Sequence, residues 1–233
     1  MIGVIVPAHN EQALLGACLR SVHAAAAHPG LSGEDVAIVV ALDRCTDRSP
    51  EIAERAGAHC VVVHAGNVGL ARAAAAQRAL ALGARWIAST DADTVVPAHW
   101  LTGQLRSGLD VFCGVVTVED WLDFDAATIA AFDGPAPPAE GHRYIHGANF
   151  GIRAQAYLRC GGFAPLACSE DVAIVQALEA VGASIHWASD PRVVTSARRD
   201  ARACGGFADY LKALEKLVHG GGATPGHVLP VLT

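Results

Sequence analysis

Two carboxylates stand one residue apart directly after an apolar segment, Asp91 and Asp93 in "IASTDADT". Side chains at positions i and i+2 of an extended chain point to the same side, so both carboxylates could aim into one crevice. Acidic groups held this close together require positive charge nearby. A small number of hard oxygen ligands, with room left for water and phosphate oxygens, suits Mg²⁺ or Mn²⁺. Taken alone, the motif is more typical of a solvated Asx turn, and a divalent-cation site is the alternative that the other motifs favour.

Two other motifs carry groups that could take part in the same chemistry. Glu170 and Asp171, in "SED", come at the start of a predicted helix, where the macrodipole favours carboxylates. Either could instead act as a general base if it reaches a reacting hydroxyl. Arg198 and Arg199, in "TSARRD", could hold a diphosphate through bidentate hydrogen bonds. The alternative for this pair is two solvated surface charges.

His142 and His146 have the spacing of zinc ligands on a helix. The glycines at 141 and 147 make a helix doubtful there, and no Cys pair or Glu completes a ligand set. A role in a substrate-binding loop is therefore favoured over a zinc site.

The elements that must position these residues alternate between strand and helix. Parallel strands joined by helices form right-handed βαβ units, and ligands bind beyond the carboxyl ends of such strands. Polar residues follow all four predicted strands, so they should converge on one edge of the sheet. Strands are predicted at 2–6, 35–42, 60–65 and 85–93, helices at 11–27, 46–58 and 69–84, and the polar strand ends are His9, Asn10, Glu11, Asp43, Asn67, Asp91 and Asp93.

The second half of the chain is less regular. We expect Asn10 to cap the first helix, and Ser169 to cap a later one. The predicted elements are one strand at 110–120, a Pro/Gly-rich loop at 133–142, a short strand and helix within 147–163, a helix at 169–183, a strand and loop at 185–199, an amphipathic helix at 205–220 and a flexible tail at 221–233.

Composition excludes several classes of function. The 233 residues carry a formal net charge of −6 without a basic patch, which argues against nucleic acid as a partner. No apolar run reaches the roughly 18 residues that span a bilayer, and the start "MIGVIVPAHNE" lacks a signal-peptide pattern, so we expect a cytoplasmic protein. The 7 cysteines form no Cys-x-x-Cys pair, which indicates reduced thiols. The sequence has no glycine-rich phosphate loop and no Gly-x-Ser-x-Gly elbow.

The order of these motifs resembles the family 2 glycosyltransferases of the GT-A fold, which are inverting enzymes that use nucleotide-diphospho-sugars. The segments that carry the resemblance, within residues 2 to about 200, are "IVPAHNE", "VVALDRCTDRS", "NVGLARAAA", "STDADT", "HGANFGIRAQAYLRCGGF" and "SED". It implies a single α/β domain of GT-A, Rossmann-like type, with a mostly parallel central sheet flanked by helices. Residues 1–100 would form its nucleotide-sugar-binding half and residues 101–220 its acceptor-binding half.

The resemblance also implies roles for individual residues. Asp171 would be the general base that deprotonates the acceptor hydroxyl. Asp93 would bind Mg²⁺ or Mn²⁺, with Asp91 on the ribose or the same metal. Arg198 and Arg199 would steady the diphosphate as it leaves. The other donor-side positions are Pro7, His9, Asn10, Glu11, Asp43 and Arg72, and the acceptor-side positions are His146, Asn149 and Glu170.

Some features depart from the family pattern or stay open. Leu42 stands where the family usually carries its first Asp of the second-strand motif, which puts uracil recognition through that position in doubt. The resemblance implies a UDP- or GDP-sugar donor and a small-molecule or glycan acceptor. The chain lacks the Gln-x-x-Arg-Trp motif of processive synthases, so we expect transfer of single sugars. The sequence leaves a homodimer open.

Two rival functions remain. A nucleotidyltransferase of similar fold is disfavoured, because "PAHNEQALLG" carries none of the cations of that class's phosphate loop. A non-catalytic nucleotide-sugar-binding module is disfavoured by the presence of both Asp93 and Asp171.

Overall fold

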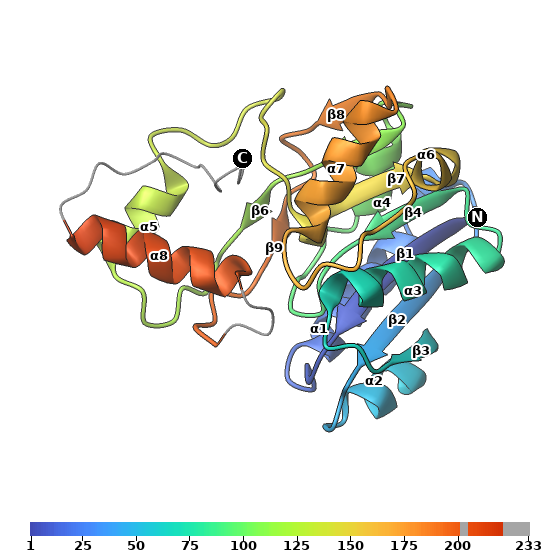
Figure 1. Ribbon diagram of the computed structural model, residues 1–233, viewed down its shortest axis with the longest axis horizontal. Coiled ribbons are helices and arrows are strands. Elements are labelled where there is room, and N and C mark those ends of the chain that lie inside the picture. Colours follow the sequence, from blue (N-terminus) through green and yellow to red (C-terminus); the bar gives the residue numbers. More distant parts are fainter. Residues whose placement is uncertain (201–204, 221–233) are drawn as a thin grey trace.

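A twisted central sheet of seven strands organises the computed structural model, which describes residues 1–200 and 205–220 (Figure 1). Along the sheet the order is β3-β2-β1-β4-β7-β5-β8, and β7 alone among these strands runs antiparallel to its neighbours. The prediction of a mostly parallel sheet is therefore confirmed. The strands are β1 (Ile2–Ala8), β2 (Val36–Asp43), β3 (His59–Val63), β4 (Trp86–Ser89), β5 (Val111–Cys113), β7 (Phe150–Arg153) and β8 (Ile185–Trp187).

Helices cover both faces of this sheet. One buried cluster joins alternate β1 residues such as Val4 and Val6 to α1 (Leu15–Ala26), α2 (Ser49–Arg55) and α4 (Trp100–Leu105). The other cluster joins the opposite face to three further helices, of which α3 and α7 lie in front of the sheet in Figure 1. These helices are α3 (Val68–Ala81), α6 (Ala154–Arg159) and α7 (Glu170–Ala180).

Helix α3 packs closely on β1, near the middle of the sheet. Its inward residues Ala71, Ala75 and Ala79 are fully buried, and their short side chains let the helix approach β1. The residue of β1 below them is Gly3, where an added Cβ would lie 2.6 Å from the Cβ of Ala79. This contact requires glycine because of space, since Gly3 has no left-handed backbone. The alanine-rich sequence of α3 thus fixes how deeply it sits.

A smaller lobe extends from one end of the sheet (Figure 1). Two short parallel strands, β6 (Val116–Thr117) and β9 (Val193–Val194), connect the sheet to α5 (Ala126–Asp133) and α8 (Phe207–His219). The two helices share a separate core that includes Phe124, Phe132, Leu211 and Leu214. The amphipathic helix predicted at 205–220 is confirmed as α8, whereas α4 and α5 were not predicted.

The single strand predicted at 110–120 is wrong, because the chain leaves the main sheet after β5. At the break an added Cβ on Gly114 would lie 2.3 Å from Nδ2 of Asn149, so the backbone passes directly over that amide. The Gly114 N–H still donates to the Asn149 carbonyl at 2.9 Å, one residue beyond the β5–β7 pairs and in the same register. Two short 3₁₀ turns, η1 (Pro29–Leu31) and η2 (Gly147–Asn149), complete the elements.

The predicted cap Asn10 is wrong, and the predicted cap Ser169 is confirmed in position only. Helix α1 begins only at Leu15, and Asn10 has a φ of 54° and accepts a hydrogen bond from the Thr46 N–H at 2.8 Å. Ser169 does precede α7, but its side chain makes no capping hydrogen bond. The tail predicted at 221–233 lies outside the described residues. Within residues 1–200 and 205–220, no helix is long and apolar enough to cross a membrane.

Replacing Gly3 by alanine should destabilise the protein, because the new Cβ meets Ala79 at 2.6 Å and Ala84 at 3.0 Å. We expect Gly3→Ala to lower the free energy of unfolding by about 1–3 kcal/mol in urea titrations. Gly16→Ala is the matched control, because its Cβ would lie 3.5 Å from the nearest atom and it occupies a helix. Equal unfolding midpoints for the two variants would contradict the close packing of α3 on β1.

Candidate functional site

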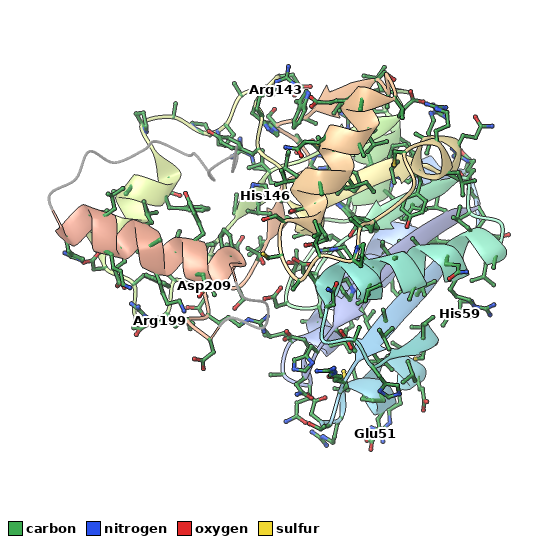
Figure 2. All side chains as sticks on the ribbon, in the orientation of Figure 1. Glu51, His59, Arg143, His146, Arg199 and Asp209 are labelled. Atoms are coloured by element: carbon green, nitrogen blue, oxygen red, sulfur yellow. The ribbon has the colours of Figure 1, made fainter. Side chains whose placement is uncertain are left out.

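A cavity of about 790 Å³ lies where the carboxyl ends of the parallel strands meet the smaller lobe. Figure 2 shows His146 and Asp209 approaching this region from the loop before η2 and from α8, and both line it, while Glu51 and His59 lie far away. The convergence of the strand ends is therefore as predicted. Among the predicted site residues, the cavity is lined by Pro7, His9, Glu11, Asp43, Arg72, Asp91, Asp93, His146, Glu170, Asp171 and Arg198.

Arg72 reaches the floor of this cavity from the first turns of α3 and is 3% exposed. Its Nη2 donates to Asp91 Oδ1 at 2.6 Å and its Nε to Glu170 Oε1 at 2.8 Å. Its Nη1 donates to the Gly147 carbonyl at 3.2 Å and to the Ser89 hydroxyl. A buried cation is tolerated only when it is paired. Burial by itself would lower the pKa of Arg72, but the neighbouring carboxylates raise it, so the guanidinium stays charged.

Arg198 also pairs with two carboxylates, on the other side of the turn that carries Asp91 and Asp93. Its Nη1 donates to Glu11 Oε2 at 2.7 Å, and its Nη2 lies 3.0 Å from Asp93 Oδ2. Burial raises the pKa of Asp93 to about 6, with Asp91 and Glu11 adding to the rise and Arg198 opposing it. Each of the two arginines therefore lies between two carboxylates. The positive charge that Asp91 and Asp93 require is supplied here by one arginine each.

Asp171 is held by two backbone groups. Its Oδ2 accepts from the Gly147 N–H at 2.9 Å, and its Oδ1 accepts from the Val172 N–H at 2.8 Å. Burial raises the pKa of this carboxyl to about 6, and the adjacent Glu170 adds to the rise, while Arg72 and the two N–H donors oppose it. A carboxylate with these properties is ionised at neutral pH and more basic than a solvated aspartate, which suits a general base.

Asp43 lies in the cavity wall, but its carboxylate holds the loop before α3. Oδ1 accepts from the N–H groups of Ala65 and Gly66 at 2.9 Å each, and Oδ2 accepts from that of Asn67 at 2.8 Å. The Asn67 side chain in turn caps α3 by accepting from the Leu70 N–H at 3.0 Å. Asp43 therefore positions the helix that carries Arg72, a role that the strand-end pattern did not reveal.

Asn149 was predicted at the acceptor, and the structure does not place it there. The residue is fully buried, with Oδ1 accepting from Trp100 Nε1 at 2.9 Å. Its Nδ2 donates to the carbonyls of Val115 and Pro191 at 2.9 and 2.8 Å. Every polar atom of the amide is thus used to hold the junction between the two sheets, and Asn149 does not line the cavity.

Arg199 and Asn10 also stay out of the cavity. The Arg199 guanidinium binds Asp123 Oδ1 at 2.8 Å and both carboxylate oxygens of Glu215 on α8, so it ties the smaller lobe together. Asn10 accepts from the Thr46 N–H, on the loop after β2. Both residues border a second hollow on the far side of Arg198 and Glu11 instead. The adjacent residues Arg198 and Arg199 thus bind different partners.

Aromatic residues form a wall of the cavity that the sequence did not point to. Phe207 and Tyr210 come from α8, with ring centroids 6.1 Å apart, and Tyr144 comes from the loop before η2. The Tyr144 ring lies 6.4 Å from that of His146. The only sequence signal was the amphipathic pattern at 205–220, which predicts an apolar stripe but not that one end of it faces a cavity.

Comparison with known proteins decides the family. Residues 3–156 match the sequence model of glycosyl transferase family 2. The chain belongs to that family. The resemblance seen in the sequence is confirmed, and with it a glycosyltransferase domain of GT-A fold. No curated protein sequence matches the chain.

Solved structures with the same fold include three glycosyltransferases. TarS of S. aureus, in complex with UDP-GlcNAc, gives a TM-score of 0.65 at 16% identity over 93% of this chain and 66% of that one. A mannosyltransferase of Pyrobaculum calidifontis, with GDP-Man and Mn²⁺, gives 0.58 at 17% identity over 94% and 69%. Glucosyl-3-phosphoglycerate synthase of Mycobacterium tuberculosis, with Mn²⁺, UDP and phosphoglyceric acid, gives 0.56 at 20% identity over 94% and 76%. The chain spans 36% of a longer TarS chain.

The acidic turn of this family 2 domain offers few ligands to a cation. Within the part of the chain that the structure describes, no group of three or more His, Cys, Asp or Glu side chains could hold a metal ion. Asp91 and Asp93 supply hard oxygens from one turn, and each contacts its arginine through one oxygen. Such a pair fits Mg²⁺ or Mn²⁺ only when other oxygens, such as those of a diphosphate and water, complete the shell.

The stability of this domain should report the buried state of Asp171. Its pKa of about 6 lies above the ordinary 3.8, so the unfolded chain releases this proton at lower pH than the folded protein does. Folding therefore becomes less favourable as pH rises through this interval. Asp171→Asn removes this titration. Between about pH 4 and pH 7, the free energy of unfolding of wild type should therefore fall by roughly 1–3 kcal/mol relative to that of the variant. Parallel pH dependences in urea unfolding would contradict the burial of this carboxylate.

Proposed function

We propose that this chain is an inverting glycosyltransferase that moves one sugar from a nucleotide-diphospho-sugar to a hydroxyl acceptor. The observation that carries the proposal is that Asp171, held by two N–H donors, lines the same cavity as Asp91 and Asp93 in a family 2 domain. Asp171 can remove a proton, and Asp91 and Asp93 can hold a cation that neutralises charge on a diphosphate. Both requirements of the reaction thus meet in one site.

Asp171 is the proposed general base. One of its carboxylate oxygens accepts the proton of the acceptor hydroxyl as the acceptor oxygen attacks the anomeric carbon of the sugar. The bond from that carbon to the diphosphate breaks, and a nucleoside diphosphate leaves with the electron pair. Attack on the face opposite the leaving group inverts the anomeric configuration. The raised pKa of about 6 supports this role, because it makes the carboxylate a better proton acceptor while keeping it ionised at neutral pH.

The donor-side proposal rests on residues 1–100 together with Arg198. Pro7 and His9 at the end of β1 line the proposed nucleotide pocket, and His9 Nδ1 donates to the Asp43 carbonyl at 2.7 Å. Arg198 is placed to contact the diphosphate from its position beside Asp93. Asp93, with Asp91, would hold Mg²⁺ or Mn²⁺. When bound, the cation neutralises charge on the leaving diphosphate.

The acceptor side is proposed to lie within residues 101–220. Glu170 and His146 line the cavity near Asp171, and the wall of Tyr144, Phe207 and Tyr210 lies within the same half. A UDP- or GDP-sugar remains the proposed donor and a small molecule or glycan the proposed acceptor. The three relatives support the donor class, since the structures of TarS, the mannosyltransferase and the synthase contain UDP-GlcNAc, GDP-Man and UDP.

The product and one substitution test this function. With the productive donor and acceptor, wild type should release free nucleoside diphosphate, whereas release of pyrophosphate would identify a nucleotidyltransferase. Asp171→Asn should lower kcat by a factor of about 10²–10⁴, the usual contribution of a positioned base, and leave donor affinity within a few-fold. The matched control is Asp35→Asn, which changes an exposed aspartate. Full turnover in Asp171→Asn would contradict the proposed base.

Metal dependence is tested separately by thermal shift. We expect UDP or GDP to raise Tm more in the presence of Mn²⁺ than in its absence, because the diphosphate completes the coordination shell offered by Asp91 and Asp93. Asp93→Asn should remove the Mn²⁺-dependent part of the shift, and Asp35→Asn should retain it. Stabilisation by a nucleoside diphosphate that is indifferent to divalent metal would contradict the role of Asp93.

A further inference from the structure

Arg72 was expected to approach the nucleotide, yet its guanidinium is occupied by the protein. Resting on the proposed function, we infer that Arg72 is a positioning residue that fixes the base Asp171 relative to the donor-side Asp91, and that Gly147 is glycine so that Arg72 can do so. The guanidinium hydrogen-bonds both to Asp91 and to two residues beside Asp171, Gly147 and Glu170.

Two routes lead from the guanidinium to Asp171. In the first, Nη1 donates to the Gly147 carbonyl at 3.2 Å, and the N–H of the same glycine donates to Asp171 Oδ2 at 2.9 Å. In the second, Nε donates at 2.8 Å to Glu170, the first residue of α7 and the direct neighbour of Asp171. The remaining nitrogen, Nη2, donates to Asp91 at 2.6 Å. One rigid group therefore sets the distance between the two halves of the site.

The planar shape of the guanidinium is essential to this arrangement. Its three nitrogens donate in three fixed directions, and a lysine ammonium at the end of a flexible stem cannot reproduce that fork. Glu170 is 5% exposed and Arg72 is 3% exposed, so neither charge can turn to water instead. Arg72→Lys thus preserves the charge and removes the geometry.

Gly147 gives an independent view of the same contact. A Cβ at this position would lie 2.4 Å from Arg72 Nη2 and 2.8 Å from Cζ. The backbone of Gly147 does not have positive φ, so alanine is allowed there by conformation and excluded only by the guanidinium. Gly147→Ala therefore displaces Arg72 from its partners without altering any charged group.

The experiment compares Arg72→Lys and Gly147→Ala with the control Gly16→Ala, whose Cβ makes only ordinary contacts. We expect both site variants to lower kcat per folded enzyme by about 10–100-fold, the scale of a displacement near 1 Å at a reacting group. The control should stay within about twofold of wild type. Circular dichroism and Tm give the folded fraction, so that loss of fold is separated from loss of alignment.

A second measurement is independent of turnover. The ¹³C signal of the Asp171 carboxyl is titrated in wild type and in each variant. The Gly147 N–H lowers the pKa of Asp171, and Arg72 holds that peptide group through the Gly147 carbonyl, so the midpoint of Asp171 should move to higher pH in both site variants and stay unchanged in Gly16→Ala. A lower Tm with wild-type kcat and an unmoved midpoint would show a merely structural role and overturn the inference.

The two proposals fail in different ways. If wild type transfers no sugar from any nucleotide-diphospho-sugar, the proposed function fails, and the carboxyl titration alone decides on Arg72. If wild type transfers sugar while Arg72→Lys and Gly147→Ala retain its kcat and its Asp171 midpoint, the positioning role fails and the function stands. Where Arg72→Lys does not fold, Gly147→Ala gives the same decision with every charge in place.

Discussion

A guanidinium removed from water is the interaction on which this site depends. Arg72 can stay charged at 3% exposure only because Asp91 and Glu170 converge on it, so three separate segments of the chain are drawn to one point. The fold supplies the approach, since the alanine face of α3 seats on Gly3 and brings the first turns of that helix to the strand ends. Asp43 anchors the start of the same helix. The packing of α3 on the sheet therefore also positions the charged groups of the site.

The alternation of acids and arginines also defines what a ligand must do. Two carboxylate–arginine–carboxylate sets, centred on Arg72 and Arg198, place four carboxylates against two arginines, so the site carries an excess of negative charge. An anionic diphosphate entering alone would add to that negative charge, whereas a divalent cation arriving with it would offset the charge. Arg198 is the more exposed of the two arginines and is the better placed to exchange protein partners for ligand ones. In the proposed function, the buried Arg72 therefore keeps its protein partners while the more accessible Arg198 binds the ligand.

Sequence reasoning succeeded where chain geometry is local and repetitive. Alternating strands and helices predict a parallel sheet, and its strand ends must share an edge, so Glu11, Asp91 and Asp93 were found together. It failed where a side chain's partner lies far along the chain. Asn149 is held by segments near residues 100, 115 and 191, and Arg199 is held by α8. No spacing rule reports such contacts, and a polar residue in a motif looks the same whether it faces a ligand or a backbone carbonyl.

The smaller lobe carries its aromatic residues on a core of its own. Phe132 and Leu211 pack within the lobe, and Phe207 and Tyr210 of α8 both pack against that core and line the cavity. The lobe can accommodate substitutions of Phe207 or Tyr210 without disturbing the packing of α3 on the sheet or the hydrogen bonds of Arg72. If this wall meets the acceptor, as proposed, the acceptor-binding surface is built separately from the packing that holds Arg72. Under the proposed function, changes on that wall would alter which acceptor binds and would leave the base and the donor-side residues in place.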